Sequence, residues 1–145
     1  MDKKTEWIKS VENAANHYLN LNDGGFDGNM KASLARSNYE EQSITFAFET
    51  QKWQMNERGA IHGGAISGMF DTAFGIVANF IAGKDEATTT DMNICYIRQF
   101  ELNDIGEIKV ITVKAGRKLI RLRAEFISKE TNKLIATASG SWMPL

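Results

Sequence analysis

Hydrophobic residues recur along the chain with two different periods, and the longest apolar segment follows neither of them strictly. Residues 59–80 (GAIHGGAISGMFDTAFGIVANF) are small or apolar at nearly every position. Such a composition is typical of a helix that is covered on most of its sides. One carboxylate, Asp71, lies in the middle of the segment. Because burial of an unpaired charge is costly, we expect Asp71 to have a function.

The rest of the chain predicts the structure that covers this helix. Residues 5–21 carry apolar side chains at helical spacing, and a polar, glycine-containing stop follows at residues 22–25. Two segments before the central helix and four after it have the pattern of β-strands, with short connections. The prediction is an α+β fold in which a curved antiparallel sheet of about six strands wraps the central helix and the last four strands form a meander. The predicted strands cover residues 30–37, 43–50, 87–99, 107–115, 119–128 and 133–143.

Length and charge narrow the class of protein. A chain of 145 residues suits one domain, with residues 1–25 as a helical extension and 26–145 as the core. With 17 Lys and Arg against 18 Asp and Glu, it lacks the basic surface of a nucleic-acid-binding protein. Cys95, the single cysteine, is expected to be buried and fits a reducing compartment. No segment has the length of a membrane span or the pattern of a signal peptide, so we expect a cytoplasmic protein without a membrane partner.

The start of the central helix has an unusual composition. Residues 62–64 are His-Gly-Gly, without the Ser, Thr, Asp or Asn that commonly caps a helix. Uncapped backbone N–H groups at this end could donate to a ligand oxygen. The Gly63 amide would then polarise an ester or thioester carbonyl and hold the oxyanion formed when it is attacked. The alternative is that the glycines only allow close packing at a junction between loop and helix.

Asp71 lies too far along the helix to act on the same carbonyl. At 1.5 Å per residue, it is about 12 Å from Gly63 along the axis. If both residues act on one substrate, Asp71 must come from a second copy of the chain, which predicts a dimer with shared sites. Burial would raise the pKa of the carboxyl, as suits a general base or a nucleophile. The alternative is a structural Asp71 bonded to the hydroxyl of Ser67 or Thr72.

These residues resemble a known family. Asn56, the His-Gly-Gly of residues 62–64, Asp71 and the segment 89–96 (TTDMNICY) are similar, in type and in spacing, to the hotdog-fold acyl-CoA thioesterases. The resemblance is to their PaaI-like and human-type thioesterase superfamily members, and it covers roughly residues 46–143.

The resemblance implies a role for each matching residue. The Gly63 amide is the oxyanion donor, and Asn56 positions or activates the attacking water or holds the thioester. His62 lies beside the thioester and orients the loop. Asp71 of the facing subunit is the general base or the nucleophile, and Thr89 holds the water or Asp71. Thr88 and Thr90 flank Thr89, so a shift of one residue would reverse its direction.

The resemblance also implies the substrate and the assembly. The reaction is hydrolysis of an acyl-CoA thioester, with no metal or separate cofactor because coenzyme A is part of the substrate. Two subunits form two sites at their interface, and such homodimers could pair into homotetramers. Gly64, Met69, Phe70 and Phe74 are expected to contact the substrate. From adjacency in the sequence, the last three are expected to line the acyl pocket together with residues near Trp53. The basic candidates for the coenzyme A phosphates are Arg98, Lys114, Arg117, Lys118 and Arg121. The alternative for each of them is an ordinary charged side chain on a solvated hairpin.

Two other functions remain open from the sequence. One is a hotdog module that binds acyl-CoA without cleaving it. The other is a hydratase or dehydratase of enoyl or hydroxyacyl thioesters, which would place an Asp–His pair differently. The presence of Asn56, the glycines and Asp71 together favours the hydrolase.

Overall fold

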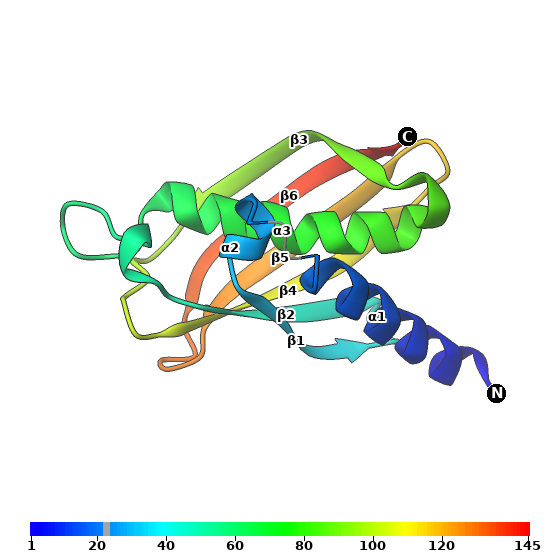
Figure 1. Ribbon diagram of the computed structural model, residues 1–145, viewed down its shortest axis with the longest axis horizontal. Coiled ribbons are helices and arrows are strands. Elements are labelled where there is room, and N and C mark those ends of the chain that lie inside the picture. Colours follow the sequence, from blue (N-terminus) through cyan, green and yellow to red (C-terminus); the bar gives the residue numbers. More distant parts are fainter. Residues whose placement is uncertain (22–23) are drawn as a thin grey trace.

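One antiparallel sheet of six strands curves around one long helix (Figure 1). The computed structural model describes residues 1–21 and 24–145, so the predicted helix stop at residues 22–25 lies partly outside the described residues. This architecture confirms the predicted α+β hotdog fold. The helices are α1 (Lys3–Leu19), α2 (Phe26–Asn29) and α3 (Gly63–Ala82), with the 3-10 turns η1 (Lys52–Gln54) and η2 (Gly83–Asp85). The strands are β1 (Ala32–Asn38), β2 (Ser43–Glu49), β3 (Ala87–Tyr96), β4 (Ile105–Ala115), β5 (Ile120–Ser128) and β6 (Leu134–Pro144).

The strand order is β1-β2-β4-β5-β6-β3, which corrects the predicted meander of the last four strands. β4, β5 and β6 do follow one another as hairpins. β3, however, pairs with β6 at the far edge, and residues 97–104 cross the end of the sheet to reach β4. That connection is anchored by the buried Phe100 and by a bridge between Glu101 and Ala60. A period-2 pattern identifies a strand but does not identify its neighbour.

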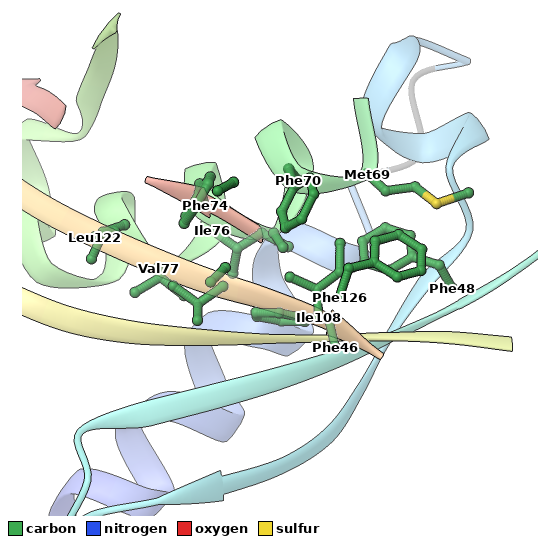
Figure 2. Close-up of a cluster of buried hydrophobic side chains, with 14 of the residues drawn as sticks. Phe46, Phe48, Met69, Phe70, Phe74, Ile76, Val77, Ile108, Leu122 and Phe126 are labelled. Atoms are coloured by element: carbon green, nitrogen blue, oxygen red, sulfur yellow. The ribbon is translucent and has the colours of Figure 1, made fainter. Parts of the chain in front are cut away.

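The core fills the concave face of the sheet under α3. Figure 2 shows side chains of α3, including Phe70 and Phe74, against residues from the neighbouring strands such as Phe46 and Phe126. The rings of Phe70 and Phe126 meet edge to face at 5.7 Å. Complete burial of one such side chain contributes about 1.5–3 kcal/mol, so this cluster holds α3 firmly against the sheet.

Two predictions from the sequence are wrong: one concerns the length of the longest apolar segment, and the other concerns the exposure of Cys95. α3 is long and apolar enough to qualify as a membrane span, which the sequence prediction did not anticipate, but most of it is buried under the sheet as in a core helix. Cys95 is exposed rather than buried. It lies on β3, whose ten residues form one edge of the sheet and are mostly exposed.

Candidate active site

The first turn of α3 is capped by a residue that the sequence prediction did not consider as a cap. His62 is the N-cap, and its Nδ1 accepts the Gly64 N–H at 2.7 Å. A neutral imidazole that accepts at Nδ1 carries its proton on Nε2. The expectation of an uncapped turn is therefore wrong for Gly64, whose amide is already bonded, but not for Gly63.

The Gly63 N–H donates to no acceptor within the described residues, and its surroundings fix its direction. The His62 carbonyl accepts the N–H groups of Ala65 at 2.9 Å and Ile66 at 3.1 Å. On the other side of Gly63, its carbonyl accepts the hydroxyl of Tyr96, from β3, at 3.0 Å. Both peptide units that flank Gly63 are held, so its N–H is an oriented donor of the kind that stabilises an oxyanion. Sequence reasoning missed Tyr96, although it ends the segment 89–96 that carried the resemblance.

Asn56, in the loop before α3, lines the same surface depression as Gly63. Its side-chain oxygen accepts the backbone N–H groups of Arg58 at 2.9 Å and Ala60 at 3.2 Å. The group left for a ligand is the NH₂, which can only donate. Asn56, Gly63, Tyr96 and Arg98 line one depression of about 320 Å³, here called the Asn56 depression. The geometry thus favours Asn56 holding a carbonyl oxygen over Asn56 withdrawing a proton from water.

Asp71 and Thr89 form a second group. The Thr89 hydroxyl donates to the Asp71 carboxylate at 3.3 Å. A bulge between Thr89 and Asp91 turns Thr90 away, and the Thr90 hydroxyl donates to the Ser141 carbonyl instead. Thr89, rather than Thr88 or Thr90, is therefore the threonine that contacts Asp71.

Neither of the two hydroxyls named as structural partners of Asp71 bonds to it. Ser67 donates to the Gly64 carbonyl, and Thr72 donates to Asp27 of α2 at 2.7 Å. Asp71 is half-buried, and this burial raises its pKa; the Thr89 hydrogen bond lowers the pKa and the nearby charge of Asp27 raises it, with a raised value as the net result. A carboxylate with a raised pKa is suited to accepting a proton.

Within one chain the two groups are separate. Gly63 and Asp71 are two turns apart on the continuous helix α3, about 12 Å along its axis. Asp71 is not among the residues that line the Asn56 depression. Each chain therefore carries an oxyanion-type donor and a carboxylate that it does not bring together.

The predicted acyl pocket needs correction. Met69, Phe70 and Phe74 each have 0% exposed surface, so they belong to the core and can line no ligand cavity without rearrangement.

Arg117 is exposed in the turn between β4 and β5, at the Thr89 end of the sheet and away from Gly63. Arg121 bonds to Asp91 and to serine hydroxyls of β6. In the described residues, no group of three His, Cys, Asp or Glu could hold a metal ion.

Solved structures share this architecture. The E. coli PaaI protein, from the phenylacetic acid degradation operon, has a TM-score of 0.81 and 16% sequence identity, with 95% of each chain covered. Thioesterase superfamily member 2 from Mus musculus has a TM-score of 0.77 and 19% identity, and the match covers 92% of this chain and 96% of that one. A hypothetical thioesterase from Streptococcus pneumoniae TIGR4, solved with coenzyme A, has a TM-score of 0.69 and 18% identity, with 78% and 87% covered. At such identities the likeness shows the hotdog fold.

Sequence comparison places the chain in a family. It finds no significant match among curated proteins. A model of the Thioesterase superfamily, however, matches residues 58–135, more than half of the chain. The matched segment contains the capped turn at His62 and Gly63 as well as Asp71 and Thr89. Because this model matches more than half of the chain, the chain belongs to the thioesterase superfamily.

Proposed function

We propose that this protein is an acyl-CoA thioesterase that hydrolyses a thioester to the carboxylic acid and free coenzyme A. The observation that carries the proposal is the pair of half-sites on α3: an oriented Gly63 N–H at its start and a half-buried Asp71, bonded to Thr89, two turns later. Two solved structures of the same fold support the choice of substrate. The proteins from Streptococcus mutans and Streptococcus pneumoniae were solved with acetyl-CoA and with coenzyme A, respectively.

In this reaction Asp71 acts as general base. It takes a proton from water while the water oxygen attacks the thioester carbon, and the Gly63 N–H holds the oxygen that becomes negative. Asn56 donates its side-chain N–H to the same oxygen. When the tetrahedral intermediate collapses, the carbon–sulfur bond breaks and the coenzyme A thiolate leaves and takes up the proton from Asp71. Thr89 orients the carboxylate through its hydrogen bond.

A direct attack by Asp71 on the carbonyl is the second route to the same products. It would form a mixed anhydride that water then cleaves. A single turnover in ¹⁸O-labelled water can identify the anhydride route. Attack by water with Asp71 as base puts the label only in the released acid, whereas label in the Asp71 side chain requires an anhydride whose Asp71 carbonyl carbon is attacked by water.

The reaction requires a homodimer. β3 is an exposed edge strand of ten residues, the kind of edge that natural proteins cover or pair. If β3 pairs antiparallel with β3 of a second copy, the two α3 helices run side by side in opposite directions. Asp71 of one helix then lies near Gly63 of the other. We propose this dimer as the active unit, and a homotetramer as a further association of such dimers.

The main test is release of thiol from acyl-CoA by wild type and by Asp71→Ala. We expect the rate to fall at least about a hundredfold, the scale of a general acid–base contribution. Glu12→Ala, on the exposed surface of α1, serves as the control and should match wild type. Wild-type turnover by Asp71→Ala would refute the mechanism. Failure of wild type to cleave short, medium, long and aromatic acyl-CoAs would favour a binding module.

A further inference from the structure

Two depressions of different chemistry flank the first turn of α3. The Asn56 depression lies on the β3 side. A second depression, of about 240 Å³, lies on the side of α2 and η1. We call it the Trp53 cleft, after its lining of Phe26, Met30, Trp53, Met55 and Ala65, to which His62 and Gly64 also contribute. Residues 62–64 are thus divided between the two depressions: Gly63 lines the Asn56 depression, and His62 and Gly64 line the Trp53 cleft.

The Trp53 cleft presents apolar side chains to solvent. Phe26 is 59% exposed, Trp53 59% and Met55 37%, and they come from two segments, α2 and the η1 turn with the residue that ends it. Large apolar side chains that gather on a surface commonly mark a binding site. His62 Nδ1 already accepts the hydrogen bond of the Gly64 N–H. The cleft therefore offers a contact surface for an apolar group.

The Asn56 depression is basic by contrast. Arg58 pairs with the adjacent Glu57 at 3.1 Å. Arg98 donates to the Leu134 carbonyl at 2.8 Å and has no carboxylate partner in the described part of the chain. One exposed guanidinium is thus left on this side of Gly63 with its charge unpaired. Guanidinium groups of this kind are well suited to phosphate oxygens.

This difference matches the two arms of an acyl-CoA thioester. The carbonyl at the Gly63 N–H carries an acyl arm on one side and the anionic coenzyme A arm on the other. We infer, on the basis of the proposed function, that the acyl arm lies in the Trp53 cleft and that the coenzyme A arm crosses the Asn56 depression with a phosphate at Arg98. A Cβ at Gly64 would lie 3.0 Å from His62 Nδ1, so a side chain at this position would crowd the capping histidine beside the cleft.

The size of the cleft defines the class of substrate. Its volume of about 240 Å³ is below the range usual for drug-sized ligands. A short aliphatic acyl group or one with a single ring fits this space, whereas a long fatty acyl chain extends beyond it. Trp53, Met55 and Phe26 are then the residues that determine acyl specificity.

The acyl arm is tested by comparing acetyl-CoA with hexanoyl-CoA. Each methylene that the cleft buries should raise kcat/KM about fourfold, and an acetyl group is too short to reach Trp53. Trp53→Ala should lower kcat/KM at least about tenfold for hexanoyl-CoA and hardly at all for acetyl-CoA. Met55→Ser should act in the same direction, and Leu119→Ala, an exposed apolar residue on the turn before β5, should leave the preference unchanged. Because Trp53 and Met55 are exposed, neither change removes a core contact.

The coenzyme A arm is tested with truncated substrates. Arg98→Ala should lower kcat/KM about tenfold for hexanoyl-CoA, the lower end of the range for a charged hydrogen bond, and leave hexanoyl-N-acetylcysteamine, which lacks the phosphates, unaffected. Lys9→Ala on α1 is the charge control.

The assignment is overturned if wild type is active but Trp53→Ala and Met55→Ser leave the acyl preference unchanged. It is also overturned if those variants change only the oligomeric mass, since the cleft would then be a contact between copies. If wild type releases thiol from neither substrate nor from longer acyl-CoAs, the proposed function itself fails.

Discussion

At the scale of single residues, Asp71 depends on a second carboxylate that the sequence gives no reason to connect with it. Asp27 of α2 accepts the Thr72 hydroxyl at 2.7 Å, and its charge contributes to the raised pKa of Asp71. Asp27→Asn keeps an acceptor for Thr72 but removes the charge, so the pKa of Asp71 should fall. Because the ionised form is the base, the acid limb of the kcat/KM profile should move to lower pH. A profile measured in parallel for Glu12→Gln should stay in place, and an unmoved limb in Asp27→Asn would contradict the role of Asp27.

Asp71 should also make the folded protein less stable at neutral pH. A carboxyl whose pKa is higher in the folded than in the unfolded chain favours the protonated form on folding. Its ionisation therefore lowers the free energy of unfolding as the pH rises above the ordinary Asp value of 3.8. Asp71→Asn should unfold at higher urea concentration than wild type at neutral pH, with a difference that disappears below that value. A variant less stable than wild type at pH 7 would show that Asp71 has a structural role.

At the scale of elements, the start of α3 is positioned from both sides. His62 holds the Gly64 amide, and Tyr96 brings a hydroxyl from β3 to the Gly63 carbonyl. Tyr96→Phe removes a bond worth about 0.5–1.5 kcal/mol and should lower kcat by about threefold to tenfold, with less effect on KM. Tyr39→Phe, whose ring packs against Trp7 far from the site, is the matched control. Equal kcat values for Tyr96→Phe and wild type would mean that the His62 cap alone orients the turn.

Elements also show how far the sequence can predict this molecule. Alternation located the six strands to within a few residues, and length and apolar composition located α3. The alternating pattern could not place β3 at the far edge of the sheet, because the strand with which β3 pairs depends on the path of residues 97–104. α2 has four residues, too few for a helical period to be recognised.

The candidate site was predictable where spacing alone decided it. Gly63 and Asp71 follow from the composition of one helix and the rise per residue. The direction of Thr89 depends on a bulge, which strict alternation cannot reveal. Phe70 and its apolar neighbours were misassigned to a pocket because proximity to Asp71 in sequence does not distinguish a core position from a surface that meets a ligand.

At the scale of the whole molecule, the separation of the half-sites makes a prediction about mixed dimers. Asn56→Ala damages one half-site and Asp71→Ala the other, so each variant alone should be nearly inactive. A dimer with one chain of each kind has one site with both residues altered and one site with both intact. Because random re-pairing of equal amounts makes about half of the dimers mixed, the mixture should recover about a quarter of wild-type activity.

The subunits can be unfolded together and refolded, with thiol release measured against the two variants refolded separately. Mixing two inactive chains restores activity only if Asn56 and Asp71 of one site come from different copies, which no arrangement of the site within a single chain would allow. A mixture no more active than its components, in samples whose mass confirms the dimer, would place both residues in one chain and refute the shared site. Recovery would show why α3 carries Gly63 and Asp71 two turns apart: the antiparallel partner brings the carboxylate of one helix to the amide of the other.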